Sequence, residues 1–190
     1  MLILNYISFF FLIILTFLSI SGYGAVFSNH KNINIFEKLF LGFIFLAFFN
    51  TLFHFFFKLN FYVNLLILLL GIIFFKINKI NIDKKKLFYF LIIIFLIPIF
   101  ITQKYHEDFG YYHLPYALSF LEEKIIFGLA NSNIAYTYNS MWLNVYPSFF
   151  TETKNYDFLT LPTFILFICF ILLLTHNFLN SKDWRLSNLF

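Results

Sequence analysis

The chain has 190 residues, of which 61% are hydrophobic and only 12% are charged, and its mean hydropathy is +0.82. This composition excludes disordered, fibrous and disulfide-stapled classes and indicates an integral membrane protein, since an ordinary soluble domain is about 25% charged. The formal net charge is +4, but the basic residues are scattered between apolar stretches. That pattern predicts membrane lipid, and no nucleic acid, as a partner.

Five apolar stretches predict five membrane-spanning helices, because about 20 apolar residues cross a bilayer as a helix. They cover approximately residues 2–20, 36–57, 61–75, 87–101 and 159–178. The first is expected to end at the turn-rich sequence Ser21-Gly22-Tyr23-Gly24. A cleaved signal peptide has basic residues before its apolar core and none precede this stretch, so we expect it to be retained in the membrane. Only Lys58-Leu59-Asn60 separates the second and third stretches, which predicts a tight helical hairpin.

The predicted fold class is therefore all-α: a polytopic helical membrane protein with about five transmembrane helices and one long extracytoplasmic loop that contains interfacial amphipathic helices. Along the chain, residues 1–101 form a four-helix transmembrane region, residues 102–158 form the loop with the candidate site, and residues 159–190 form the last transmembrane helix and a short tail.

The distribution of basic residues predicts the orientation. If all five stretches cross, nine of the thirteen Lys and Arg lie on one side and four on the other. The positive-inside rule then places the amino terminus and the 102–158 loop outside the cytoplasm and the carboxyl terminus inside. The expected location is the bacterial cytoplasmic membrane. The orientation of the first helices inverts if the short third stretch does not cross.

The 102–158 loop concentrates the polar residues, with six of the nine acidic residues and eight of the twelve Tyr. Two amphipathic helices are expected in it. Pro115 suits the first turn of one, whose apolar stripe is Leu114, Leu118, Leu121 and Ile125. A second stripe, interrupted by Pro147, consists of Trp142, Tyr146, Phe149 and Phe150. Aromatic-rich amphipathic segments favour the membrane interface, so we expect the loop to lie flat over the bundle as a lid.

The densest group of reactive side chains, residues 106–115, directly follows the fourth stretch. Glu107 and Asp108 are adjacent carboxylates that can share a divalent metal, or one can act as a general base while the other tunes it. His106 and His113 add imidazoles that can bind a metal or a phosphate. An alternative interpretation is that the two acids are solvated or cap the following helix. The spacing of the two histidines does not match a helical zinc motif.

The run Asp108-Phe109-Gly110-Tyr111-Tyr112-His113-Leu114-Pro115, with Gly128-Leu129-Ala130-Asn131 and Asn139-Ser140-Met141-Trp142 after it, resembles the first large outer loop of bacterial GT-C membrane glycosyltransferases. The likeness is to the relatives of protein mannosyltransferases and aminoarabinose transferases, in which an aspartate is followed by Tyr-His-Leu-Pro and an amphipathic helix. Such enzymes transfer a sugar from a polyprenyl-phosphate carrier to a lipid, glycan or protein acceptor on the outer face.

The resemblance implies roles for individual residues. Asp108 matches the loop aspartate, which would deprotonate the acceptor or help to bind a divalent metal. Glu107 would assist it, although many relatives carry the second acid after the aspartate. His113, with Tyr112 beside it, would contact the carrier phosphate or the acceptor. The cofactor stays open, with a divalent metal as the candidate.

The remaining implied residues would line the sugar site: Asn131, Asn139 and Trp142. Loop turns and an interface anchor are an equally good interpretation of these three. GT-C enzymes usually have more spans than this chain, so we expect an amino-terminal portion of such an enzyme, or a chain that works with a second chain supplying further helices. The alternative function is a non-catalytic polytopic membrane component that handles polysaccharide or a lipid carrier, or an inactive fragment.

Few polar residues lie within the predicted spans. Asn50 and His54 are one helical turn apart on the second span, and Asn64 is on the third, so the three are expected to hydrogen-bond across the hairpin and hold the two helices together. Cys169 lies within the last apolar run and is expected to be a small hydrophobe that faces lipid or another helix.

Overall fold

The computed structural model describes residues 2–28, 33–80, 97, 110–111, 114–128, 131, 144–149 and 161–180. Throughout these residues the regular structure is helical and contains no strand, which confirms the predicted all-α class. The elements in chain order are α1 (Leu2–Phe27), α2 (Ile35–His54), α3 (Phe61–Ile77), α5 (Leu114–Glu122), the 3-10 turn η4 (Pro147–Phe149) and α7 (Leu161–Asn180).

Four of the five apolar stretches correspond to described helices, namely α1, α2, α3 and α7. The fourth predicted stretch, at 87–101, lies outside the described residues except for Ile97, which is buried. By length and composition, α1 over Tyr6–Phe27 and α2 over Ile35–His54 can each cross a membrane. Helices α3 and α7 contribute shorter apolar segments, Phe61–Ile77 and Leu161–Thr175.

The expected end of the first helix at residues 21–24 was wrong, because α1 continues to Phe27. Its glycines mark close packing instead of a turn. A Cβ on Gly22 would collide with the carbonyl oxygen of Gly71 in α3, and a Cβ on Gly24 would collide with the carbonyl oxygen of Lys38 in α2. Small residues let the backbones of two helices approach closely. In an apolar environment the helix also continues through them, because a backbone amide that left the helix would lose its hydrogen bond.

Local signals set the starts of α2 and α3. The backbone N–H of Asn34 donates to the Glu37 side chain at 2.9 Å, which is half of a capping box at the start of α2. The side chain of Asn60 accepts from the backbone N–H of Val63 at 3.1 Å and caps α3. Helix α2 ends three residues earlier than predicted, at His54, so residues 55–60 form the connection to α3.

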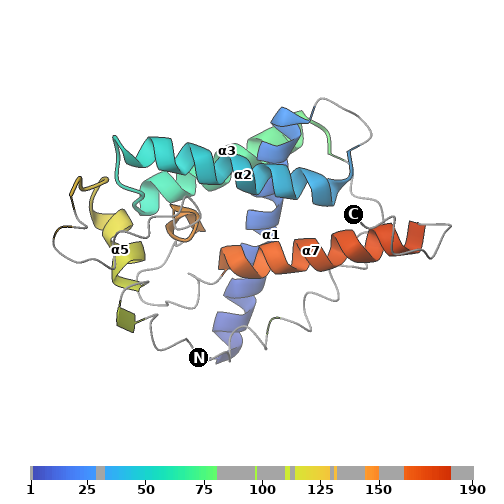
Figure 1. Ribbon diagram of the computed structural model, residues 1–190. Helices are drawn as coiled ribbons and strands as arrows, with labels where there is room; N and C mark the ends of the chain where they lie inside the picture. The colour runs from blue at the N-terminus through green and yellow to red at the C-terminus, as the bar shows by residue number, and fades with distance from the viewer. Residues whose placement is uncertain are drawn as a thin grey trace.

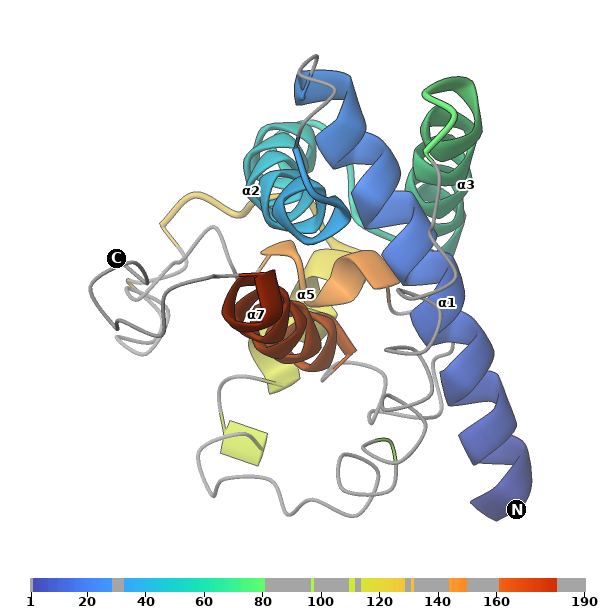
Figure 2. The same cartoon turned by 90° about the vertical axis from the view of Figure 1, so that its right-hand side faces the viewer.

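Helix α1 lies between α2 and α3, so the two helices joined by this short connection flank α1 and do not form the expected tight hairpin (Figure 2). Figure 1 shows that the axes of α2 and α7 are aligned and that α1 crosses them at a steep angle. The close approach of Gly42 in α2 to the Ile20 carbonyl belongs to this crossing. A bundle of five spans stays a prediction.

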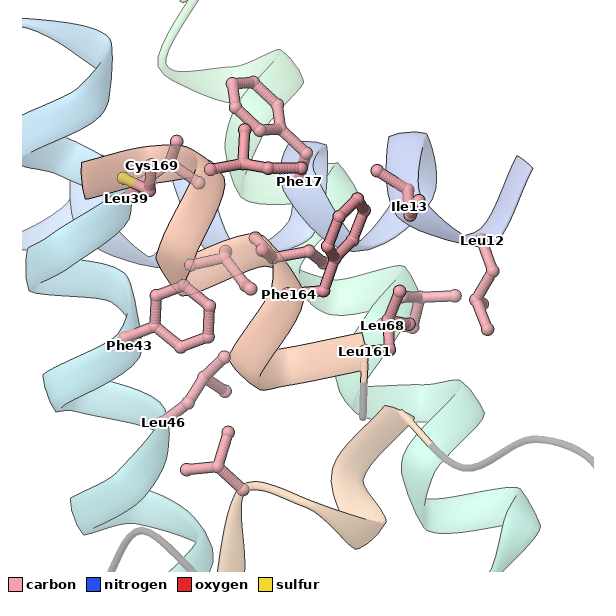
Figure 3. Packing of buried hydrophobic residues seen from close by; sticks show 14 of the residues in the cluster. Leu12, Ile13, Phe17, Leu39, Phe43, Leu46, Leu68, Leu161, Phe164 and Cys169 are labelled. Atoms are coloured by element: carbon pink, nitrogen blue, oxygen red, sulfur yellow. The ribbon is translucent and has the colours of Figure 1, made fainter. Parts of the chain in front are cut away.

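The apolar core lies where α7 packs across α1 and α2. Figure 3 shows side chains from the four long helices converging there, including Phe17, Phe43, Leu68 and Phe164. The rings of Phe9 and Phe164 lie 6.0 Å apart. Cys169 is buried, and its thiol contacts the Phe36 carbonyl oxygen at 3.3 Å, which confirms that it is a small helix-facing residue.

Candidate functional site

A buried cluster of polar side chains, which we call the polar junction, lies where the end of α2, the start of α3 and residues 144–148 meet. Its members are Asn50, Thr51, His54, Asn64, Asn144 and Ser148. Thr51 is half-buried and the other five side chains are at most 1% exposed. Because buried polar groups are costly unless they are hydrogen-bonded, this cluster must be held together by specific contacts.

The α2 side of the polar junction is bonded to the segment that carries η4. The Asn50 amide donates to the hydroxyl of Ser148 and, at 3.4 Å, to the carbonyl oxygen of Asn144. Ser148 in turn donates to the same carbonyl at 2.9 Å. The Asn144 amide donates to the Thr51 hydroxyl at 3.1 Å. Adjacent positions on α2 therefore bind both ends of the 144–148 segment.

His54 and Asn64 bind two further points of the segment between α3 and α7, which we call the outer segment after its predicted location. The ring Nε2 of His54 lies 3.0 Å from the Glu123 carbonyl oxygen. Since a carbonyl can only accept, Nε2 carries the proton and donates it. The edge of the same ring packs on Phe120, with centroids 4.6 Å apart. The Asn64 amide donates to the carbonyl oxygens of Pro147 at 2.7 Å and Leu59 at 2.9 Å.

Backbone hydrogen bonds fasten α5 to the same end of the molecule. The N–H of Leu59 donates to the Phe120 carbonyl at 2.8 Å, and the N–H of Ile125 donates to the His54 carbonyl at 3.1 Å. Figure 1 shows α5 beside the connection between α2 and α3. The outer segment is therefore attached to this connection by side chains and backbone together.

The prediction that Asn50, His54 and Asn64 hydrogen-bond across the α2–α3 hairpin requires a correction to the partners. All three are buried and hydrogen-bonded. The bonds that define the polar junction, however, reach residues 123 and 144–148, which are 69–98 residues away in sequence. These side chains hold the outer segment to the helices.

The chemistry of the polar junction is that of amides, hydroxyls and one imidazole. Among the described residues no carboxylate is buried, and no three His, Cys, Asp or Glu side chains gather as metal ligands. The side-chain oxygen of Asn50 has no hydrogen-bond partner in the described part of the chain. The polar junction can thus accept a hydrogen bond from a neutral polar group or from water.

Most of the site residues predicted from sequence lie outside the described residues: Glu107, Asp108, Tyr112, His113, Asn139 and Trp142. Of the predicted set the structure describes Asn131, which is exposed and whose backbone N–H donates to the Gly128 carbonyl at 2.8 Å. Gly128 has a positive φ of 81°. The described turn is at Phe127 and Gly128, whereas Asn131 itself has helical backbone, and its place in a sugar site stays a prediction.

The two predicted loop helices have different outcomes. The first is confirmed as a helix, α5, but the predicted stripe is not its buried face. Tyr116, Ala117 and Phe120 are buried, whereas Leu114, Leu118 and Leu121 are half-buried and Ile125 lies beyond the end of the helix. The second was placed on a stripe from Trp142 to Phe150, of which residues 144–149 are described and contain only the turn η4. Pro147 begins that turn, and its missing N–H leaves no donor for a continuing helix.

Sequence reasoning missed Asn144 and Ser148 as partners of the helices. The available signal was weak: both are small polar residues inside an otherwise aromatic stripe. Their partners on α2 lie more than ninety residues earlier, so local periodicity carries no information about the pairing.

A model of a protein family described as a domain of unknown function (DUF8201) matches residues 3–190, which is nearly the whole chain. The chain therefore belongs to this family. No curated protein and no solved structure matches the chain.

Proposed function

We propose that this member of the DUF8201 family is a multi-pass integral membrane protein. The supporting observation is the distribution of side chains on its helices. Small and polar residues, including Ser19, Gly42, Asn50 and Asn64, face inward among large apolar ones, and the outward positions of the helices are large and apolar as well. On α2 and α3 the outward residues include Ile44, Phe48, Leu52, Leu66, Leu69 and Ile73. Water would make such a surface unstable, but hydrocarbon suits it.

The contacts between helices support the orientation deduced from charge. In that orientation the α2–α3 connection and the 102–158 loop share the extracytoplasmic side. The polar junction joins these two parts, through Asn64 and Pro147 among others. Alternating crossings also require α2 and α7 to be antiparallel, and Figure 1 shows these two helices running in opposite directions.

The proposed activity is sugar transfer of the GT-C type on the extracytoplasmic face, from a polyprenyl-phosphate carrier to a lipid, glycan or protein acceptor. The observation that carries it is the run from Asp108 to Pro115, followed by the amphipathic helix α5. Transfer with inversion needs one base opposite the leaving phosphate, and Asp108 is the proposed base. A cation or metal that screens the phosphate would ease its departure. The chain would act alone or with a second chain that supplies further helices.

The test is the variant Asp108→Asn, in the full chain with any partner it needs, assayed for transfer of radiolabelled sugar from polyprenyl phosphate in native membranes. We expect loss of transfer by at least about a hundredfold, the size typical of a general base, with unchanged expression. Glu122→Gln is the matched control, because Glu122 is an exposed acid in the same loop. Transfer that survives Asp108→Asn would remove this residue from the mechanism.

The alternative function is carrier handling without catalysis. Among the described residues no carboxylate is buried where it could act as a base. This alternative predicts that polyprenyl phosphate binds to the purified protein without turnover. Binding that is insensitive to Asp108→Asn, in membranes where no transfer is detected, would favour it over the enzyme.

A further inference from the structure

Exposed aromatic side chains gather around the connection between α2 and α3 and beyond the end of α5. This group, which we call the aromatic collar, consists of Phe55, Phe56, Phe57, Phe61, Tyr62 and Phe127. Three of them are among the most exposed large side chains of the described residues: Phe56 is 73% exposed, Tyr62 is 77% exposed and Phe127 is 81% exposed. Such a group is costly in water and needs a covering surface.

The aromatic collar comes from two parts of the chain that meet at Phe55 and Phe127, whose rings lie 6.0 Å apart. The rings of Phe61 and Tyr62, at the start of α3, lie 5.6 Å apart. Exposed charged residues from the same two segments, Lys58 and Lys124, accompany these rings. Aromatic rings beside lysines are typical of the boundary between lipid headgroups and acyl chains, where the rings are anchored and the amines reach water.

The length of α2 puts the aromatic collar at that boundary. Its 20 residues rise about 30 Å, which is the thickness of a bilayer's hydrocarbon core. The start of the helix is polar, with Asn34 and Glu37, so its other end must reach the opposite boundary at residues 54–57. The outward apolar stripe of α2 leads directly into the collar through Leu52.

We propose that the aromatic collar docks into the headgroup–acyl boundary of one leaflet and thereby sets the depth of the polar junction, which lies directly inside it. This inference rests on the proposed membrane insertion. His54, the last residue of α2, would then sit at the edge of the hydrocarbon, buried beneath Phe120.

The test uses spin labels on single cysteines at Tyr62 and Phe127, in a Cys169→Ala background, with the full chain reconstituted in vesicles of phosphatidylcholine and phosphatidylglycerol. Relative collision rates with oxygen and with a water-soluble nickel chelate give the depth of each label. We expect both collar labels to lie in the boundary, about 5–10 Å deep. A label at Ile44, which is exposed in the middle of α2, is the control and should lie far deeper.

Two results would overturn the proposal. Collar labels that collide freely with the nickel chelate would show that water covers the aromatic collar. Labels shielded from both reagents, with spin–spin broadening, would show that a second copy covers it. Alkaline carbonate extraction of the unlabelled protein separates this failure from that of membrane insertion. Retention in the pellet with water-exposed collar labels contradicts only the collar proposal, whereas extraction into the supernatant contradicts both.

Discussion

Two regions hold the molecule together by different means. One is the close packing of α1 against α2 and α3, which we call the crossing, and the other is the polar junction. At the crossing, the backbones of two helices approach closely at Gly22 and Gly71, and this approach depends on the absence of side-chain atoms at the two glycines. At the polar junction, Asn50, Asn64 and Asn144 bring helices and loop together, and the fit depends on donors meeting acceptors. Close backbone contact thus assembles helices that are neighbours in the core, whereas polar side chains attach a segment that lies far away in the sequence.

The largest loss of stability is expected from a substitution that adds side-chain atoms at the crossing. Gly22→Leu forces a side chain into the carbonyl of Gly71, and backbone atoms cannot move aside as a flexible side chain can. We expect a loss of about 3 kcal/mol or more in the free energy of unfolding, measured by SDS titration in mixed micelles. Gly110→Ala is the control, because a Cβ at Gly110 has nothing within 4 Å. Equal stability of the two variants would mean that the backbones do not touch.

Removing a hydrogen-bond donor from the polar junction is expected to lower the free energy of unfolding by less than filling the crossing does. It is also expected to affect a different part of the chain. Asn64→Leu keeps the volume but removes the donor to the carbonyls of Leu59 and Pro147. We expect a loss of about 1–3 kcal/mol, because two buried acceptors are left unsatisfied. Hydrogen exchange should increase at residues 144–149 and stay unchanged at the crossing in α1. Faster exchange in α1 alone would contradict the separation of the two regions.

A smaller loss of stability is expected when one hydrogen bond at the crossing is removed. The hydroxyl of Tyr23 donates to the Ile67 carbonyl at 2.7 Å, and its ring packs edge-on against Phe74 with centroids 5.6 Å apart. Tyr23→Phe keeps the ring, and Ile67 lies inside α3, so the expected loss is only about 0.6 kcal/mol. The same SDS titration measures it. A loss as large as that of Gly22→Leu would mean that this bond, and not close packing, holds α1 to α3.

A similarly small effect is expected at Cys169. Its thiol is a weak donor, so Cys169→Ala loses only one buried sulfur and its contact with the Phe36 carbonyl. We expect a loss of about 1 kcal/mol or less, measured as a shift in thermal unfolding in detergent. A variant that fails to fold would show that the packing of α7 on α2 depends on this thiol.

Sequence patterns predicted the elements well where apolar runs are long. The helices α2, α3 and α7 appear within a few residues of their expected bounds, because a long apolar run away from water must satisfy its own backbone hydrogen bonds, and a helix does so within one segment. The same reasoning ended α1 too early at Gly22, since glycine both breaks helices and lets them pack closely. Which of the two applies depends on the partner helix, and Gly71 lies about fifty residues further along the chain.

The site was less predictable for a similar reason. Asn50, His54 and Asn64 were recognised as polar residues in apolar surroundings, which is a property of sequence alone. Their pairing with the 144–148 segment is a property of the fold, because it joins residues more than eighty positions apart. The Asp108 motif remains a prediction from resemblance.

A double-mutant cycle between Asn50 and Ser148 tests the central claim, that the polar junction attaches the outer segment to α2. The variants Asn50→Ala, Ser148→Ala and the double variant are unfolded in mixed micelles and their free energies compared. We predict a coupling energy of about 0.6–1.7 kcal/mol, as for side-chain hydrogen bonds between membrane helices. Additive effects, as expected for the control pair of Asn50→Ala with Tyr23→Phe, would contradict the claim.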